Sequence, residues 1–319
     1  MIARRSGMDP NRRWFSVSPF PWRLRTVTLP SMHCRKVALV GIGLLGGSIG
    51  LALKQRRLAD FVSGYVRRAA SVAECQSLGL ADQVTTNVNE AVADADLVIL
   101  CTPISQMAPL AAEFAPSLKK GALLTDVGSV KSGVVEALEP LAARAQASFV
   151  GSHPMAGAEK TGPKSARADL FENAVCVVTR TPRTNPEALR RVESFWSDLG
   201  MKLMQLTPDR HDDLVSRSSH LPHVVAAELA NYVLSPALPP EQAGLCASGF
   251  RDCTRVASGS PEMWRDIAIE NRVNLGKVLG VFIEDLQEFQ IALQRGDQKS
   301  VEEFFSSAKR RRDDWISGA

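Results

Sequence analysis

A glycine-rich segment near the start of the chain has the spacing of a dinucleotide-binding loop. Gly41, Gly43 and Gly46 form a G-x-G-x-x-G motif between an apolar run and a segment that can form a helix. In such loops the glycines allow a tight turn, close approach of the backbone to a pyrophosphate, and packing of the helix on the strand. The phosphates then meet the free N–H groups of the helix N-terminus. We therefore predict cofactor binding by this loop, including Leu44 and Leu45; a glycine-rich turn without a ligand is the alternative.

The residues that follow the second predicted strand bear on the type of cofactor. Sites for NAD commonly place an acidic residue about 20 positions after the loop, whereas an arginine there accommodates the 2′-phosphate of NADP. Val66 occupies that position, and Arg67 and Arg68 follow it. Two guanidinium groups can bind a phosphate through paired hydrogen bonds. The sequence thus favours NADP over NAD, unless both arginines are solvated surface side chains.

Two polar clusters come directly after predicted strands. Residues 125–131 include Ser129, and residues 151–159 include His153. Ligands of open α/β sheets bind at the carboxyl ends of the strands, so both clusters are expected to face the nicotinamide. A histidine there can take the proton of a hydroxyl group while its carbon loses hydride. This pattern predicts a dehydrogenase with a histidine base.

The other histidines and one lysine have less support as functional residues. His220 and His223 are three residues apart, but no glutamate at zinc-site spacing and no third ligand accompany them, so we predict no metal. We expect His223 to cap or pack within its own helix. His33 and His211 belong to no motif and are expected on the surface, as is Lys131 at a helix N-terminus.

Strands and helices alternate in the first half of the chain. This order predicts a Rossmann-like, doubly wound parallel sheet with right-handed crossovers. Two further apolar runs, 174–179 and 202–206, are expected to extend the same sheet. The other predicted strands are 36–41, 61–66, 95–101, 122–126 and 148–151, with helices over 49–57 and 71–78.

After residue 206 the pattern becomes helical. Apolar residues recur every three or four positions over 212–234, 263–295 and 302–315, and a proline-rich loop lies at 235–240. Because residues 273–291 are very apolar, we expect this part to dimerise. The predicted organisation is therefore a loose basic extension (1–34), a dinucleotide-binding domain (35–206) and a helical substrate and dimerisation domain (207–319).

Composition excludes several classes of protein. The chain has 319 residues, 45% hydrophobic and 23% charged, which does not fit a disordered, collagen-like or coiled-coil protein. Its six cysteines include no C-x-x-C pair, so we expect reduced thiols in a cytoplasmic protein. The apolar run 37–53 is shorter than a typical span of about 20 residues and is rich in glycine, so no membrane association is predicted.

The net charge of +4 comes from one end of the chain. Residues 1–36 contain eight basic residues and one acidic residue, which leaves the remainder with a net negative charge. Because a nucleic-acid site needs a basic face on a folded domain, no nucleic-acid partner is predicted. We interpret residues 1–34 as a loose extension or the product of an early start codon, with a targeting peptide as the less favoured alternative.

Together these motifs resemble the prephenate/arogenate dehydrogenase family of tyrosine biosynthesis. The resemblance covers about residues 35–310 without large gaps, and five motifs in order make it specific. They are Gly41-x-Gly-x-x-Gly-Gly-Ser, Asp126-x-Gly-Ser-x-Lys, Gly151-Ser-His-Pro-Met-Ala-Gly, Ser219-His-Leu-Pro-His, and Phe250-x-Asp-x-Thr-Arg followed by Met263-Trp-Arg-Asp.

The resemblance implies roles for individual residues. His153 matches the family's proton-accepting histidine, and Ser129 matches a serine near the nicotinamide and this histidine. Arg255 matches the arginine that holds a substrate carboxylate. The resemblance also assigns His220 and Trp264 to the substrate pocket, Glu159 and Asp252 to its entrance, and Thr102 and Pro103 to a cofactor-contacting turn. Glu159 and Asp252 could instead be ordinary ion-pair partners of Lys160 and Arg255.

The implied reaction is oxidative decarboxylation of prephenate to 4-hydroxyphenylpyruvate, or of arogenate to tyrosine, with hydride transfer to NAD(P)+. The family also implies an intertwined homodimer, and the extent of the match predicts a monofunctional enzyme. Two alternatives stay open. A β-hydroxyacid dehydrogenase would use a lysine in the helical domain, and we find no such motif. A non-catalytic dinucleotide-sensing protein would be expected to lack His153 or Ser129, and both are present.

Overall fold

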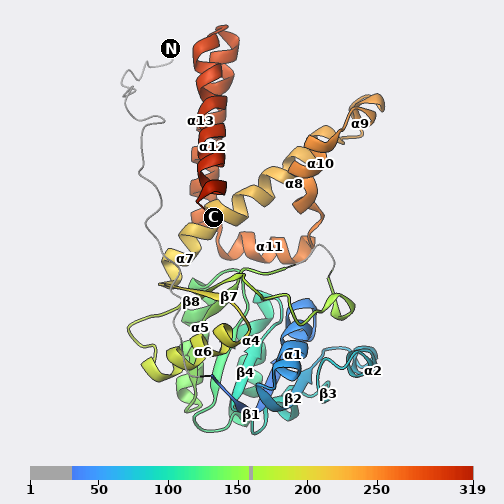
Figure 1. Ribbon diagram of the computed structural model, residues 1–319, viewed down its shortest axis with the longest axis vertical. Coiled ribbons are helices and arrows are strands. Elements are labelled where there is room, and N and C mark those ends of the chain that lie inside the picture. Colours follow the sequence, from blue (N-terminus) through green and yellow to red (C-terminus); the bar gives the residue numbers. More distant parts are fainter. Residues whose placement is uncertain (1–30, 158–160, 319) are drawn as a thin grey trace. The chain divides into compact units, whose positions relative to one another are not determined.

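The computed structural model describes residues 31–157 and 161–318 of the chain (Figure 1). These residues fall into two compact units, one that ends at Val278 and one that begins at Leu279. The larger unit contains both sheets and every described residue to which the sequence assigns a role in cofactor binding or catalysis. In the part of the chain that the structure describes, no helix is both long and apolar enough to cross a membrane.

A six-stranded parallel sheet forms the centre of the larger unit. Its order is β3-β2-β1-β4-β5-β6, and every neighbouring pair is parallel. The strand order reverses between β1 and β4, which is where doubly wound sheets open a ligand-binding crevice. The predicted fold class is therefore confirmed. The strands are β1 (Cys34–Val40), β2 (Ala59–Tyr65), β3 (Gln83–Thr85), β4 (Leu97–Leu100), β5 (Leu123–Asp126) and β6 (Ser148–Val150).

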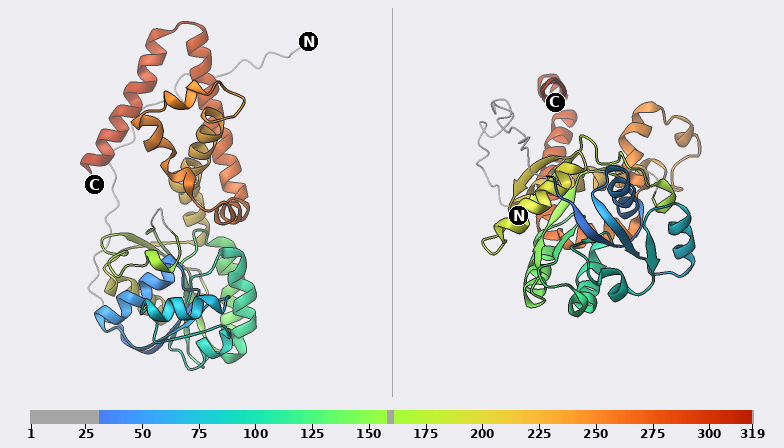
Figure 2. Two further views of the ribbon diagram at one scale, coloured as in Figure 1. Left: turned by 90° about the vertical axis from the view of Figure 1, so that its right-hand side faces the viewer. Right: turned by 60° about the horizontal axis from the view of Figure 1, so that its bottom comes forward.

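Helices cover both faces of this sheet (Figures 1 and 2). Successive residues of β1 point to opposite faces: Val37 and Leu39 belong to one apolar cluster, Ala38 and Val40 to another. A strand buried on both sides must be apolar throughout, which explains the continuous hydrophobic run in the sequence. The helices of this part are α1 (Leu44–Arg56), α2 (Ala70–Ser77), α3 (Val88–Val92), α4 (Ile104–Phe114), α5 (Ser132–Arg144) and α6 (Pro186–Asp198), with 3₁₀ turns η1 (Ala115–Ser117) and η2 (Pro163–Ser165).

A second, three-stranded sheet follows the first. Strands β8 (Val175–Thr179) and β9 (Lys202–Leu206) pair in parallel, and β7 (Ser152–Pro154) pairs antiparallel with β8. The prediction that residues 174–179 and 202–206 extend the parallel sheet was wrong. The chain leaves the first ladder after β6, and β7 then pairs with β8 in a new one.

Helices make up the remainder of the described chain. The predicted helix 212–234 begins earlier, at α7 (Pro208–Val215), because the Thr207 side chain caps the Arg210 N–H. It then contains a π turn, η3 (Ser216–His220), before α8 (Leu221–Val233). The predicted helix 263–295 is interrupted at Asn271, between α11 (Pro261–Glu270) and α12 (Arg272–Gln294). Between α8 and α11 lie α9 (Glu241–Gly244), α10 (Ser248–Thr254) and the 3₁₀ turn η4 (Arg255–Ser258).

The smaller unit consists of the later part of α12 and α13 (Gln298–Ser317), which run side by side (Figure 2). The Phe289 ring packs against the ring of Phe304, with 4.5 Å between centroids. Within one chain α12 buries only Leu275 and Val278, and Val281, Leu286 and other large apolar side chains stay exposed. A single copy of the chain therefore leaves much of the apolar surface of α12 exposed.

Candidate active site

The glycine motif adopts the geometry that a dinucleotide loop needs. Gly41 follows β1 with a φ of +104°, a conformation that favours glycine. A Cβ on Gly46 would lie 2.0 Å from the Gly41 carbonyl oxygen, so helix α1 can pack this closely only without a side chain there. Gly43 is the N-cap of α1, makes no side-chain cap, and has open space where a Cβ would be. Because Gly43 has no side chain that could cap the helix, it leaves the first N–H groups of α1 available to a pyrophosphate.

The other predicted cofactor residues surround this loop. Leu44 and Leu45 are half-buried in the first turn of α1. Thr102 lies against Gly41 after β4, and its hydroxyl is buried without a hydrogen-bond partner in the described part of the chain. Pro103 is the N-cap of α4. A buried hydroxyl without a partner next to a glycine loop fits a ligand that supplies the missing hydrogen bond.

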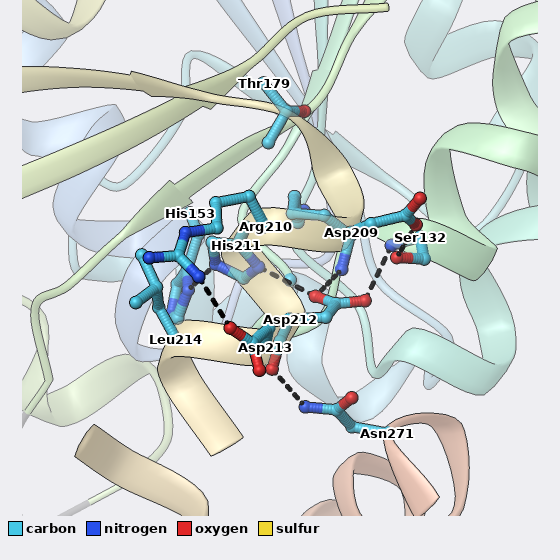
Figure 3. Close-up of polar contacts among 12 residues, drawn as sticks. Ser132, His153, Thr179, Asp209, Arg210, His211, Asp212, Asp213, Leu214 and Asn271 are labelled. Atoms are coloured by element: carbon cyan, nitrogen blue, oxygen red, sulfur yellow. Dashed lines mark hydrogen bonds and ion pairs between the residues drawn. The ribbon is translucent and has the colours of Figure 1, made fainter. Parts of the chain in front are cut away.

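His153 lies on β7 and is almost completely buried. Its Nδ1 is 2.8 Å from Nε2 of His211, and Nδ1 of His211 is 2.7 Å from the Asp212 carboxylate (Figure 3). The hydrogen bond to His211 is the only one that the His153 ring makes among the described residues, and it leaves Nε2 unused. One ring nitrogen is therefore held in place, and the other is available to a ligand.

His211 is fully buried, so the prediction that it lies on the surface was wrong. It sits on α7, which packs against α5 and β8. His211 and Val215, one turn apart, are both buried on α7. That spacing was the signal in the sequence that could have shown His211 to face inward.

The Asp212 carboxylate holds the His211 ring, and through it the His153 ring, in position. It accepts hydrogen bonds from the backbone N–H groups of Lys131 (2.7 Å) and Ser132 (2.8 Å) at the start of α5. Burial alone would raise the pKa of Asp212, but the hydrogen bonds from His211 and these N–H groups outweigh it, and the pKa is lowered. Asp212 is therefore an ionised hydrogen-bond acceptor at neutral pH.

Lys131 is also buried, contrary to the prediction that it is a surface residue at a helix N-terminus. Its ammonium group pairs with the Asp126 carboxylate and donates to the Ser152 carbonyl oxygen at 2.7 Å. Asp126 in turn accepts from the backbone N–H groups of Ser152 (3.0 Å) and Gly128 (2.8 Å). This ion pair joins the end of β5 to β7 next to His153.

His220, at the end of the π turn, is the third buried histidine of the site. Its Nδ1 is 3.1 Å from the side-chain nitrogen of Asn271, which is also 2.9 Å from the Asp212 carbonyl oxygen. Its Nε2 is buried and has no hydrogen-bond partner in the described chain. The Trp264 ring meets the His220 ring edge-on, with 6.1 Å between centroids, and stacks on His223 at 3.7 Å. Two helix irregularities, the π turn and the break at Asn271, thus position this ring.

Of the four other predicted site residues, the structure links Ser129 and Arg255 to these histidines. Ser129 is half-buried, and its backbone is near His220. Arg255 begins η4; burial lowers the pKa of His223, and the Arg255 charge lowers it further. Asp252 is exposed on α10, and Glu159 lies outside the described residues. His223 hydrogen-bonds the Ser219 carbonyl oxygen at 2.9 Å, which confirms the expected packing within its own helix.

The environment keeps His153 and His220 neutral. Burial lowers the pKa of His153 well below the ordinary histidine value, and the nearby His211 and Lys131 lower it further. Burial also lowers the pKa of His220 to about 4, although the Asp212 charge opposes the shift. Neutral His153 is in the form that accepts a proton at physiological pH.

His33 lies at the surface as predicted, unlike His211 and Lys131. His33 is exposed and lies 3.3 Å from the Asp60 carboxylate. Arg67 and Arg68 are exposed directly after β2. Among residues 31–157 and 161–318, no group of three His, Cys, Asp or Glu side chains could hold a metal ion.

Comparison with known proteins agrees with this site. Residues 49–205 match the family model described as prephenate dehydrogenase, nucleotide-binding domain, and residues 207–307 match the one described as prephenate dehydrogenase, dimerization domain. The chain is 34% identical over 282 residues to a cyclohexadienyl dehydrogenase of Zymomonas mobilis, covering 87% of this chain and 95% of that protein. It is 34% identical over 280 residues to a prephenate dehydrogenase of Bacillus subtilis, covering 87% and 75%.

A solved structure shares the fold over almost the whole described chain. The prephenate dehydrogenase of Aquifex aeolicus, in complex with hydroxyphenyl propionate and NAD+, superposes with a TM-score of 0.81 at 30% identity and covers 90% of this chain and 99% of that one. These relatives do not favour the β-hydroxyacid dehydrogenase or the dinucleotide-sensing protein. With both family models matched in order, and the glycine loop and buried histidines in place, the chain belongs to the prephenate dehydrogenase family.

Proposed function

We propose that this protein catalyses the NAD(P)+-dependent oxidative decarboxylation of prephenate to 4-hydroxyphenylpyruvate, or of arogenate to tyrosine. The observation that carries the proposal is His153, a buried neutral histidine with one ring nitrogen tied to His211 and the other without a partner in the described chain. The cyclohexadienyl and prephenate dehydrogenases to which the chain is similar support this choice of reaction.

The residues at the ends of β1 and β4 fit the cofactor. The open space at Gly43, the tight turn at Gly41 and the partnerless Thr102 hydroxyl would hold a dinucleotide pyrophosphate at the N-terminus of α1. When bound, the nicotinamide accepts the hydride that leaves the hydroxyl-bearing carbon of the substrate.

His153 provides the base for the same step. Its neutral ring takes the hydroxyl proton as the carbon–oxygen bond becomes a carbonyl, and the His211–Asp212 pair stabilises the positive charge that forms on the ring. The bond between the ring carbon and its carboxylate then breaks, its electron pair moves into the resulting dienone, and the carbonyl oxygen recovers a proton from His153 to give the phenol. Carbon dioxide departs, and the ring becomes aromatic, which makes the reaction effectively irreversible.

Arg255, His220 and Trp264 would orient the substrate. Arg255 is close enough to His223 to lower its pKa, and His223 stacks on Trp264, which in turn meets His220. A carboxylate that must leave as carbon dioxide should not be held too tightly, so we assign Arg255 to the side-chain carboxylate.

Replacing Arg255 by alanine is therefore expected to raise KM for the substrate about 10- to 100-fold while kcat stays within a few-fold, because a hydrogen-bonded charge contributes about 1.5–3 kcal/mol. Steady-state kinetics measure both constants. Arg251→Ala, an exposed arginine on α10, is the matched control. A large fall in kcat at unchanged KM would refute an orienting role for Arg255.

We further propose that NADP is the preferred cofactor. Arg67 and Arg68 are exposed directly after β2, where such folds bind the 2′-phosphate of NADP. The double variant Arg67→Ala/Arg68→Ala is expected to raise KM for NADP+ by about tenfold or more. KM for NAD+ should change little, which serves as the internal control. If the wild type prefers NAD+, or both KM values change equally, NADP selection by these arginines is excluded.

The exposed apolar side chains of α12 lead us to propose a homodimer through the helical domain, which we place after residue 206. The match of residues 207–307 to a family model described as a dimerization domain supports this. The double variant Val281→Asp/Leu286→Asp is expected to give the monomer mass of 34.6 kDa by light scattering, against twice that mass for the wild type. Lys277→Ala on the same helix is the control. A monomeric wild type would contradict the proposal.

Absorbance at 340 nm tests the reaction directly. Wild-type protein is assayed with prephenate and with arogenate, each with NAD+ and NADP+. We expect cofactor reduction with at least one pair and release of carbon dioxide in equal amount. The absence of reduction with all four pairs would reject the proposed function.

A further inference from the structure

We propose that His211 and Asn271 are positioning residues that hold His153 and His220 in opposite ring tautomers. His153 then presents a bare Nε2 that accepts a hydrogen bond, and His220 presents an Nε2–H that donates one. The inference deepens the proposed function and rests on it for the identity of the substrate. The tautomers themselves follow from the hydrogen-bond partners of each ring.

The assignment for His153 starts at Asp212. Its ionised carboxylate already accepts two backbone N–H groups and can only accept from His211, so His211 carries its proton on Nδ1. Nε2 of His211 is then a lone pair. The nitrogen 2.8 Å away, Nδ1 of His153, must supply the proton of that hydrogen bond, and Nε2 of His153 is left bare.

The assignment for His220 starts at Asn271. The Asn271 side-chain nitrogen lies 2.9 Å from the Asp212 carbonyl oxygen, which can only accept, and the Asn271 oxygen accepts from Asn274 at 2.8 Å. The amide orientation is therefore settled from both ends, and its second N–H points to Nδ1 of His220. Because Nδ1 is an acceptor, the proton of neutral His220 is on Nε2.

That Nε2–H is a buried donor without a partner in the part of the chain that the structure describes. The Ser129 backbone is close enough to raise the pKa of His220, but it does not reach hydrogen-bond geometry with Nε2. A buried donor left unpaired is unfavourable, so a ligand oxygen here is favoured. A carboxylate or carbonyl oxygen is the chemical group that this nitrogen would bind.

Asp212 thus sets the tautomers of both histidine rings. The Asp212 side chain acts on His153 through His211 (Figure 3), and its carbonyl oxygen acts on His220 through Asn271. A substrate that carries a hydroxyl group at one end of a ring and a carboxylate at the other matches an acceptor and a donor in one orientation only. In the reverse orientation the carboxylate would meet a bare nitrogen, so the tautomers select the productive pose.

Nitrogen NMR of protein labelled at histidine measures the tautomers without turnover. The chain has five histidines, which single variants assign. At neutral pH we expect His153 to be protonated on Nδ1 alone and His220 on Nε2 alone. A wild-type His153 protonated on Nε2, or a His220 protonated on Nδ1, would overturn the proposal whatever the activity.

Two substitutions of His211 separate positioning from packing. His211→Phe keeps an aromatic ring but removes the acceptor, so His153 should lose its single tautomer and kcat should fall about 10- to 100-fold, with KM changed less. His211→Gln places an oxygen opposite Nδ1 of His153 and should restore the tautomer and most of kcat. His33→Phe, at the surface, should change neither. An unaltered His153 tautomer in His211→Phe would refute the role of His211.

Asn271→Leu tests the other ring. It removes the donor to Nδ1, so His220 should populate both tautomers and KM for the substrate should rise at least tenfold; Arg272→Ala, the exposed neighbour, should change KM less than threefold. An unchanged KM and His220 spectrum would refute the role of Asn271. If the tautomers are as stated but neither prephenate nor arogenate is oxidised, the proposed function fails while the positioning network stands. If prephenate or arogenate is oxidised but the tautomers differ from those stated, the proposed function stands and the positioning network fails.

Discussion

Replacing His153 by asparagine is expected to lower kcat about 10³-fold with a much smaller change in KM. A positioned general base contributes about 10²–10⁴-fold to a rate, and asparagine can hydrogen-bond a hydroxyl group but cannot take its proton. Besides its burial, the basic side chains that lower the pKa of His153 include those of His211 and Lys131, and both already have partners. His211 is committed to Asp212, and Lys131 is paired with Asp126.

The measurement is the initial rate of cofactor reduction at saturating substrate. His33→Asn, an exposed histidine paired with Asp60, is the matched control and should retain wild-type kcat. Circular dichroism and thermal unfolding must show that both variants are folded. A His153→Asn enzyme with kcat within threefold of the wild type would mean that the base is another residue.

Replacing Lys131 by methionine is expected to decrease the free energy of unfolding by about 3–5 kcal/mol. The side chains of Lys131 and Asp126 are both fully buried, and removal of one partner leaves the other charge without compensation in a medium of low dielectric constant. The ammonium group also donates to the Ser152 carbonyl oxygen, so the variant leaves a second buried group unpaired.

Chemical denaturation of the single and double variants tests this ion pair. The loss in the double variant Lys131→Met/Asp126→Asn should be smaller than the sum of the two single losses by at least about 1 kcal/mol, because it buries no unpaired charge. Lys119→Met, a half-exposed lysine that pairs with Asp96, is the control and should lose about 1 kcal/mol or less. Additive losses would show that the two side chains do not interact.

Local pattern was enough to predict the cofactor-binding half of the fold. An apolar strand, a glycine loop and a helix follow one another within about twenty residues, and each glycine's role depends on backbone geometry that the motif itself specifies. The positive φ of Gly41 and the close packing at Gly46 agree with that expectation. Fully buried parallel strands are also easy to recognise, since both faces must be apolar.

The second sheet could not be predicted in the same way. Strand β7 has only three residues, Ser152 to Pro154, which are too few for any periodicity. Strands β8 and β9 have ordinary apolar patterns, and such patterns do not state which neighbour a strand will have. In the described chain this sheet is separate because β7 pairs with β8 and not with a strand of the first sheet.

Buried polar partners were the part of the site that sequence reasoning missed. Lys131 and Asp212 are 81 positions apart, and Asp212 and Asn271 are 59 apart, so no local sequence pattern predicts their contacts. A charged or imidazole side chain without a motif is ordinarily at the surface. His211 and Lys131 are exceptions because partners brought in by the fold satisfy their hydrogen bonds.

The central claim is that Nε2 of His153 faces the substrate hydroxyl group, and a crystal structure of the ternary complex tests it most directly. The complex should contain the oxidised cofactor and a 4-hydroxyphenyl product analogue. The account predicts Nε2 of His153 within about 3.2 Å of the hydroxyl oxygen, with Nδ1 still on His211. A His153 ring turned away from that oxygen, or a hydroxyl group bound by another side chain, would contradict it.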